Sequence, residues 1–232
     1  MIIGRGLLGN SLSAIDNDKY LFYVNGISNS VLHHIPGNNF EVNEIKKIAE
    51  KKEEGIFVYL STSQVNSKFN IDRPYVQHKL FIEDLIREKF SKYLIIRTSN
   101  LVGNNKWNKH TLFNYLFNCL ELNEKITVNP FVTRNFLDSS HFVSLLQCYL
   151  NNYSINKIIE IVNPISFTMD QIIYEFEKYF DKKFTIKRVS EISDFAIFEL
   201  EVQLSFDLFA RCNLETKDYV SHLLSKYYSQ KT

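Results

Sequence analysis

The chain has 232 residues, of which 45% are apolar and 23% are charged, with 27 basic and 26 acidic side chains. This composition indicates a folded, soluble protein with one sizeable core and excludes a disordered chain. Because the charges balance, nothing favours nucleic acid or an anionic membrane as a partner. No stretch approaches the roughly 18 apolar residues of a membrane span, and no secretion signal follows Met1, so we expect a cytoplasmic protein.

Neither a disulfide framework nor a metal site is predicted. Cys119, Cys148 and Cys212 are widely separated and form no CxxC pair, which predicts reduced packing residues. His33 and His34 are adjacent but have no third ligand at a suitable spacing, so we interpret them as a loop pair.

Short apolar runs alternate with helical patterns in the first half of the chain, which predicts βαβ units and a parallel sheet. The expected strands are residues 1–3, 20–24, 56–60 and 93–96, and the expected helices are 7–15, 42–54 and 75–90. Beyond residue 100 the pattern is less regular, with helices at 111–122, 140–150 and 169–180 and strands at 126–128 and 158–162. Thr168 and Gln171 have the spacing of a capping box before the last of these helices.

A glycine-rich run, Gly4-Arg5-Gly6-Leu7-Leu8-Gly9, follows the first expected strand and opens the first helix. Glycines let the backbone turn sharply and approach a pyrophosphate, whose charge then meets the free N–H groups of the helix. A strand-to-helix turn without a ligand is the alternative. The context favours dinucleotide binding and a shortened Rossmann-type α/β fold, with a mainly parallel sheet and helices on both faces.

The choice between NADP and NAD depends on the end of the second strand. A carboxylate that binds the ribose 2′-OH of NAD normally lies there, but the run from Asn25 and Gly26 to Ser30 contains none. Arg5, between the glycines, is suited to a 2′-phosphate and favours NADPH, with NADH as the other possibility. An arginine in solvent without a ligand is the alternative for Arg5.

Tyr75 and Lys79 form a YxxxK pair at the start of the helix after Ser61-Thr62-Ser63. The same spacing occurs four more times in the chain, so only the position after a strand distinguishes this pair. At i and i+4 the two share a helix face, and an ammonium there lowers the pKa of a phenol. With a hydroxyl such as that of Thr62 to hold a carbonyl, these groups form an acid/base site suited to hydride transfer.

Five stretches follow one another along the chain. They are the glycine run, Ser61 to Val65, the Tyr75/Lys79 pair, Arg97 to Gly103 and Arg134 to Leu137. In this order they resemble the extended short-chain dehydrogenase/reductase family, whose members are NAD(P)-dependent nucleotide-sugar epimerases, dehydratases and 4-ketoreductases. His78 lies between Tyr75 and Lys79, and we expect it to point away from the site, to the surface.

The resemblance implies a role for each matched position. Tyr75 would donate a proton, Lys79 would lower its pKa and hold the nicotinamide ribose, and Thr62 would bind the carbonyl oxygen. The other expected site residues are Gly4, Arg5, Gly6, Leu7, Leu8, Gly9, Asn25, Gly26 and Ser61 for the cofactor, and Ser63, Asn100 and Arg134 for the nucleotide sugar. Where the family's dehydratases carry Asp-Glu, this chain has Ser63 and Gln64, which counts against dehydration.

The chain also departs from the family pattern. Only 65 residues separate Gly9 from Tyr75, which leaves space for about two strands at roughly 30 residues for each βαβ unit. The second and third strands of the family, which build the adenosine pocket, are therefore expected to be missing. A loosely held cofactor suits a reductase, which exchanges it in every turnover, better than an epimerase, which recycles one NAD.

We therefore predict NADPH-dependent reduction of the 4-keto group of a nucleotide-activated deoxysugar, in the synthesis of cell-surface polysaccharide. A nucleotide-sugar epimerase and a non-catalytic relative that has lost cofactor binding are the alternatives. In a single domain, residues 1–105 are expected to form the cofactor-binding core, and residues 106–232 mainly a substrate-binding lobe with late core elements. Family members commonly dimerise through the helices expected at 42–54 and 75–90, so we expect a homodimer.

Overall fold

A computed structural model of the protein describes residues 1–26, 38–51, 54–67, 71–104, 111–130, 132–189 and 200–229. Its helices are α1 Leu7–Leu12, α2 Asn38–Glu50, α3 Pro74–Lys89, α4 Leu112–Glu121, α5 Ser139–Asn152, α6 Met169–Phe180, α7 Gln203–Arg211 and α8 Tyr219–Tyr228. Its strands are β1 Ile2–Ile3, β2 Tyr20–Tyr23, β3 Ile56–Thr62, β4 Tyr93–Thr98, β5 Asn100–Val102, β6 Lys125–Val128, β7 Thr133–Arg134, β8 Phe136–Asp138, β9 Lys157–Ile161, β10 Phe167–Thr168 and β11 Thr185–Arg188.

In the described part of the chain, the central sheet has five parallel strands in the order β1-β2-β3-β4-β9. Every residue of β2 and β3 is buried, which explains why these strands are apolar without alternation: helices cover both faces. The parallel register aligns the strand ends, so Thr62 of β3 pairs with Thr98 of β4 at the carboxyl edge. The predicted α/β class with a mainly parallel sheet is confirmed.

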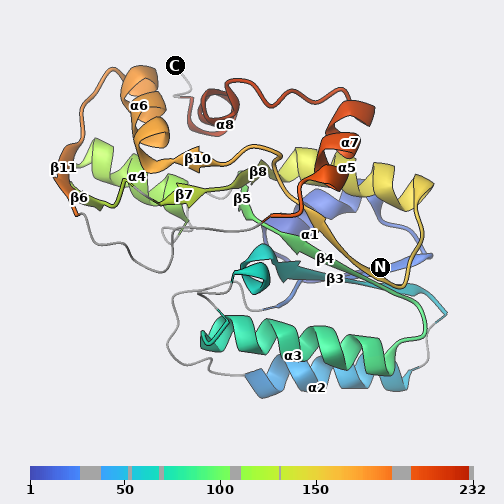
Figure 1. Ribbon diagram of the computed structural model, residues 1–232. Helices are drawn as coiled ribbons and strands as arrows, with labels where there is room; N and C mark the ends of the chain where they lie inside the picture. The colour runs from blue at the N-terminus through green and yellow to red at the C-terminus, as the bar shows by residue number, and fades with distance from the viewer. Residues whose placement is uncertain are drawn as a thin grey trace.

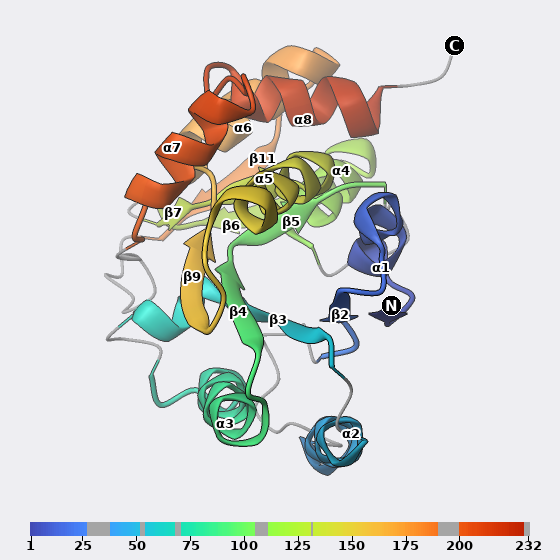
Figure 2. The same cartoon turned by 90° about the vertical axis from the view of Figure 1, so that its right-hand side faces the viewer.

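Helices lie on both faces of this sheet (Figure 1 and Figure 2). On one face, Ile45 of α2 and Ile82 and Ile86 of α3 pack against Phe57 and Tyr59 of β3. On the other face, α1 and α5 lie over the sheet, and their core continues without a break into the second half of the chain. The sheet therefore has two apolar layers of unequal size.

The connection from β1 through α1 to β2 has an unusual handedness. Strands β1, β2, β3 and β4 follow one another across the sheet in one direction, yet α1 lies on the face opposite α2 and α3 (Figure 2). The β1-α1-β2 connection consequently has the opposite hand to the next two, whereas nearly all such connections share one hand. A doubly wound sheet gives this arrangement when the strands beyond β1 are removed and β1-α1 joins the other half directly. Among the described residues, β1 is the edge strand, as the short Gly9 to Tyr75 interval predicts.

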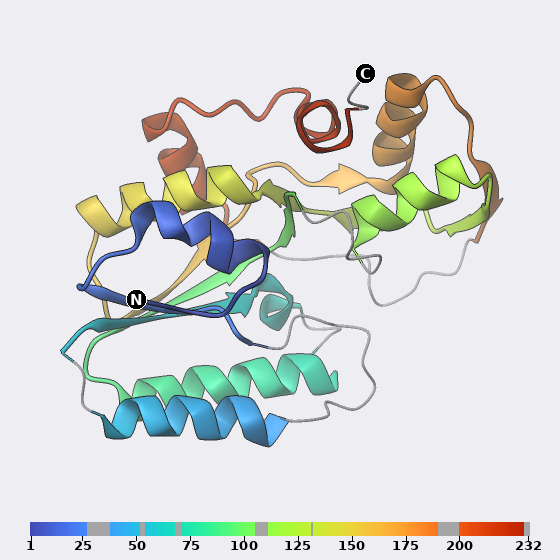
Figure 3. The same cartoon turned by 180° about the vertical axis from the view of Figure 1, so that it is seen from behind.

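The second half of the chain forms a lobe beside the carboxyl edge of the sheet (Figure 3). Three two-stranded pairs, β5–β8, β7–β10 and β6–β11, lie there with α4, α6 and α8. From the same half, α5 and β9 return to the sheet. The predicted capping box is confirmed, because the side chains of Thr168 and Gln171 each accept a hydrogen bond from the other's backbone N–H.

Two predictions of secondary structure need correction. The charged helix expected at 42–54 is α2, Asn38–Glu50, so it begins and ends four residues earlier. Near its start, the buried residue Glu41 contacts polar partners and breaks the apolar period. Helices α7 and α8 were not predicted, although Val220, Leu223 and Leu224 recur at helical spacing.

Within the described ranges, none of the helices combines the length and apolar character needed to cross a bilayer. The pair His33 and His34 lies outside the described residues.

Candidate active site

The carboxyl end of β3 brings Thr62 and Tyr75 together. Thr62 ends the strand and accepts a hydrogen bond from the backbone N–H of Gln64 at 3.3 Å, which caps the 3₁₀ turn Ser63–Asn66. Tyr75 enters from the first turn of α3, where Pro74 occupies a position that tolerates proline. The Thr62 hydroxyl lies close enough to the Tyr75 phenol to lower its pKa, and both side chains are buried.

Lys79 lies one turn along α3 from Tyr75, but its ammonium is engaged elsewhere. Its Nζ donates to the hydroxyl of Tyr59 at 2.8 Å, stands 3.6 Å from Oε1 of Glu41 and is 6.0 Å from the Tyr75 ring centre. Burial raises the pKa of Tyr75 to about 12, against the hydrogen bond from Thr62, which lowers it. Desolvation outweighs that hydrogen bond, and the predicted lowering of this pKa by Lys79 stays a prediction.

The glycine run forms a tight elbow between β1 and α1. Gly4 has φ +128°, and a Cβ there would lie 2.8 Å from the backbone of Val24. A Cβ on Gly9 would lie 2.3 Å from the carbonyl oxygen of Gly4, so the strand and the helix touch at this point. A Cβ on Gly6 would meet nothing within 4 Å, so Gly6 faces open space.

The neighbours of the elbow are partly available for a ligand. Arg5 is exposed, while Leu7 and Leu8 are half-buried, and Leu8 packs on the core. Asn25 is exposed, and its amide donates to Glu44 at 3.1 Å. A Cβ on Gly26 would lie 2.8 Å from Nζ of Lys79, which places this glycine directly against the lysine.

The two serines that flank Thr62 are occupied by structural partners. Ser61 donates to Oε1 of Glu83 at 2.5 Å, and Ser63 donates to the backbone carbonyl of Thr98 at 3.2 Å. Both serines are buried. In these positions their hydroxyls stabilise the end of the sheet, and the predicted roles in binding cofactor and substrate have no support from these contacts.

The predicted substrate residues lie where the lobe meets the sheet. Asn100 is exposed, and its amide donates to the backbone carbonyl of Asn135 at 3.0 Å, which ties β5 to the turn after β7. Arg134 is largely buried, and its pKa is lowered by desolvation and by the charge of Arg73. Arg73 precedes Pro74 at the start of α3, so a second guanidinium, which the sequence motifs do not indicate, stands near Arg134.

His78 does not point to the surface, which corrects that prediction. Its ring is buried, and its Nε2 lies 2.8 Å from Oε2 of Glu41, the same carboxylate that stands near Lys79. Glu41 itself is 2% exposed. No sequence motif marks Glu41, because its position is set by the packing of α2 on α3.

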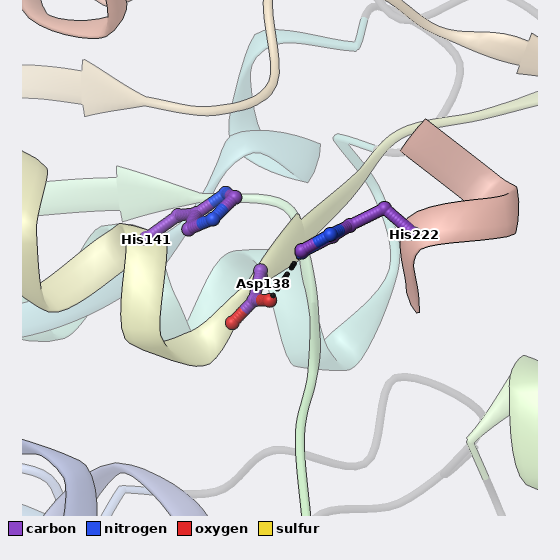
Figure 4. Close-up of side chains that lie close together, drawn as sticks. All are labelled: Asp138, His141 and His222. Carbon is purple, nitrogen blue, oxygen red and sulfur yellow. Dashed lines mark hydrogen bonds and ion pairs between the residues drawn. The ribbon is translucent and has the colours of Figure 1, made fainter. Parts of the chain in front are cut away.

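A second cluster of polar side chains lies away from this site, at the junction of β8, α5 and α8. Figure 4 shows Asp138 with His141 and His222, residue types that also bind metals. The carboxylate of Asp138 is fully engaged, however: His222 and Lys226 lie within 3.0 Å of Oδ2, and Tyr227 and Ser140 donate to Oδ1. Because the ammonium of Lys226 already balances this charge, we interpret the cluster as an anchor for α8.

Several solved structures have a similar fold. UDP-glucuronic acid 4-epimerase from Bacillus cereus, in complex with UDP-glucuronic acid and NAD, aligns with 97% of this chain and 77% of its own, with TM-score 0.69 and 16% identity. RMD from Pseudomonas aeruginosa, complexed with NADPH, covers 90% of this chain and 80% of its own, with TM-score 0.65 and 12% identity. The dTDP-glucose 4,6-dehydratase from Bacillus anthracis, in complex with NAD, covers 95% and 74%, with TM-score 0.64 and 14% identity. No family model and no curated protein matches the sequence.

The chain shares the Rossmann-type α/β fold of these three enzymes. In the doubly wound sheets of this kind, a dinucleotide lies across the point where the strand order reverses. The described residues keep the half of that sheet that carries Thr62, Tyr75 and Lys79, and β1 ends it. The open space at Gly6 suits a pyrophosphate, and the edge formed by Thr62, Tyr75 and Gly26 suits a nicotinamide. The residues therefore fit one half of NAD(P) well, while the described sheet has no strand for the adenosine half.

Proposed function

We propose that the protein reduces the 4-keto group of a nucleotide-activated deoxysugar with NADPH. Among the described residues the sheet ends at β1 and has no strand for the adenosine half of the cofactor, and this observation supports reduction. A loosely held cofactor suits a reductase, which exchanges it in every turnover, better than an epimerase, which recycles one NAD. Burial raises the pKa of Tyr75 to about 12, so its phenol carries a proton at neutral pH, as the donor for the oxygen of a ketone must.

The mechanism assigns one task to each group at the carboxyl end of β3. The hydroxyl of Thr62 and the phenol of Tyr75, which lie close together, would both turn to the carbonyl oxygen. Tyr75 would give this oxygen its proton as negative charge develops there, and Thr62 would hold the oxygen in place. The elbow at Gly4, Gly6 and Gly9 would hold the cofactor. When bound, NADPH supplies the hydride for the carbonyl carbon.

The substrate proposal depends on the two guanidinium groups of Arg73 and Arg134. The two lie close enough for the charge of Arg73 to lower the pKa of Arg134. A diphosphate offers several oxygens to neighbouring guanidinium groups. We therefore propose that the diphosphate of a nucleotide sugar binds here, with Asn100 beside the sugar. A role in making cell-surface polysaccharide follows only from the analogy of fold.

A direct assay tests this function. The protein is mixed with NADPH and a panel of 4-keto nucleotide sugars, and the absorbance of the reduced nicotinamide is followed. We expect loss of that absorbance with one sugar, in equal amount to the ketone consumed. Binding of a nucleotide sugar without any loss of NADPH would favour the non-catalytic alternative. Interconversion of two sugars with catalytic NAD and no net oxidation would favour the epimerase.

A substitution in the glycine elbow should change cofactor binding without changing the stability of the fold. We expect Gly6→Ala to leave the melting temperature unchanged, because its new methyl group meets no protein atom, and to raise the Kd for NADPH on the order of tenfold. Fluorescence titration of the nicotinamide measures this Kd. Unchanged NADPH affinity in Gly6→Ala would exclude the elbow as the pyrophosphate site.

The outer face of α2 and α3 supports the proposal of a homodimer. Phe40 of α2 and Phe81 of α3 are 62% and 54% exposed. A groove beside Phe81 is lined by Lys46, Phe81, Asp84, Leu85, Glu88 and Lys89. Apolar groups flanked by both signs of charge suit a two-fold contact, in which the same patch meets itself.

Charge placed on this face should therefore prevent association. We expect Phe81→Glu to convert a dimer to a monomer in sedimentation velocity. The matched control is Phe206→Glu, since Phe206 is 47% exposed on α7, away from this face. Equal sedimentation of the wild type and Phe81→Glu would show that α3 does not form the contact.

A further inference from the structure

Four buried side chains connect α2, β3 and α3 behind the proposed active site. Lys79 Nζ donates to the hydroxyl of Tyr59 at 2.8 Å, and that hydroxyl donates to Oε1 of Glu41 at 2.8 Å. On the other oxygen of the same carboxylate, His78 lies 2.8 Å away. None of the four residues is more than 7% exposed. We call this set, Glu41, Tyr59, His78 and Lys79, the Glu41 network.

Burial of Lys79 disfavours its charge. A lysine without water favours its neutral amine form, and desolvation lowers the pKa of Lys79, whereas the charges of Glu41 and Glu83 raise it. Glu83 is already paired, because both of its oxygens accept hydrogen bonds from the guanidinium of Arg97, at 3.1 and 2.7 Å. Glu41 is therefore the carboxylate placed to stabilise the charge of Lys79.

The surroundings of Gly26 hold this arrangement in place. A Cβ on this residue would lie 2.7 Å from Oε1 of Glu41 and 2.8 Å from Nζ of Lys79. The backbone after β2 thus closes directly over the pair, on the side where the nicotinamide portion of the cofactor is proposed to lie. A larger side chain at this position would displace one charge from the other.

We propose that Glu41 is a positioning residue that keeps Lys79 in its charged form beside Tyr75. The inference rests on the proposed function for its purpose: once Tyr75 has given up its proton, a buried phenolate needs a cation nearby. Tyr59 links the two charges and His78 holds the far oxygen of the carboxylate. Other groups that face the network are Tyr23 from β2 and Tyr75 and Glu83 from α3.

Direct titration of Lys79 tests the charge assignment without any substrate. Lysine Cε is labelled with ¹³C, and the Lys79 signal is identified by its absence in Lys79→Met. In Glu41→Gln, which keeps the size of the side chain, we expect Lys79 to titrate about one to three pH units lower than in the wild type. Glu50→Gln is the matched control, on the same helix but exposed. Equal titration in Glu41→Gln and Glu50→Gln would overturn the proposal.

Two further variants separate the charge of Glu41 from its packing. Tyr59→Phe removes the linking hydroxyl but neither charge, so we expect a smaller shift in the same direction. Glu41→Asp retains the charge, and we expect a titration near that of the wild type even if the melting temperature falls. A lowered titration in Glu41→Asp equal to that in Glu41→Gln would contradict the role of charge.

The pH profile of turnover connects the network to the reaction. In Glu41→Gln we expect the alkaline limb of kcat to move to lower pH by the shift measured for Lys79, with little change in KM. An unmoved limb would overturn the positioning role. If the wild type consumed no NADPH while Glu41→Gln still lowered the Lys79 titration, the proposed function would fail and the charge assignment would stand.

Discussion

Replacement of Tyr75 by phenylalanine should lower kcat for ketone reduction by about 100-fold to 10,000-fold, the usual contribution of a positioned general acid. The phenol is the buried donor that contacts Thr62, and phenylalanine keeps the ring and removes the proton. Because the raised pKa of Tyr75 keeps the phenol protonated across neutral pH, the wild-type rate should not fall between pH 6 and 9 through ionisation of Tyr75. Stopped-flow absorbance of the nicotinamide measures the effect.

The chain provides a matched control for this variant. Tyr174 is also followed by a lysine four residues later, and Lys178 lies 6.0 Å from its ring centre. Tyr174 is 60% exposed on α6. Tyr174→Phe should therefore retain full activity, which would show that the position after β3, and not the spacing, makes the site. Full activity of Tyr75→Phe would remove the proposed acid.

Replacement of Asp138 by asparagine should lower the free energy of unfolding by about 2–4 kcal/mol. Its side chain is fully buried and accepts hydrogen bonds from α5 and α8, so asparagine leaves several donors unsatisfied. The estimate is at the lower end for a broken buried pair, because Lys226 is 35% exposed and can be hydrated. A chain of this size should then lose roughly 5–15 °C in melting temperature, measured by circular dichroism.

The effect of Asp138 should depend on pH in a defined direction. Burial alone would raise the pKa of Asp138, but hydrogen bonds from Lys226, Tyr227 and Ser140 outweigh it and hold the pKa well below its usual range. Its contribution is therefore present above the unfolded value of about 4 and is lost as the pH falls below it. The difference between wild type and Asp138→Asn should shrink from pH 6 to pH 3.

An exposed ion pair serves as the control for this anchor. Asp170 lies 2.7 Å from Arg188, and both side chains are about half exposed. Asp170→Asn should cost less than about 1 kcal/mol, since water screens such pairs. A loss in Asp138→Asn no larger than that in Asp170→Asn would show that α8 is held by its apolar face alone.

The secondary structure could be predicted from the sequence mainly where apolar residues recur in a clear strand or helix pattern. The runs at β2, β3 and β4 and the helix after Pro74 were predicted near their observed bounds. The short interval between Gly9 and Tyr75 also predicted the missing strands, since chain length limits how many βαβ units can fit. The start of α2 was missed because a buried carboxylate, Glu41, occupies its inner face and looks like a surface residue.

The candidate site could be predicted only as far as its motifs reach. Thr62 and Tyr75 were found because a strand end and a helix start meet at one edge of a parallel sheet. Ser61, Thr62 and Ser63 each carry a hydroxyl, and the sequence does not show which of them is available to a ligand. The partners of Ser61 and Ser63 are distant in sequence. For the same reason Glu41 and Arg73 carry no motif: each is brought to the site by tertiary packing.

The transfer of deuterium from NADPH tests the central claim, that Thr62 and Tyr75 form a site for reduction of a sugar ketone. NADPH labelled with deuterium at C4 of the nicotinamide is incubated with the wild-type protein and a 4-keto nucleotide sugar, and the product is analysed by mass spectrometry. With the deuterium on the transferred face, we predict one deuterium at sugar C4 for each NADPH oxidised, and label transferred about 100-fold to 10,000-fold more slowly by Tyr75→Phe. An unlabelled product, or a label that Tyr75→Phe transfers equally well, would contradict the account.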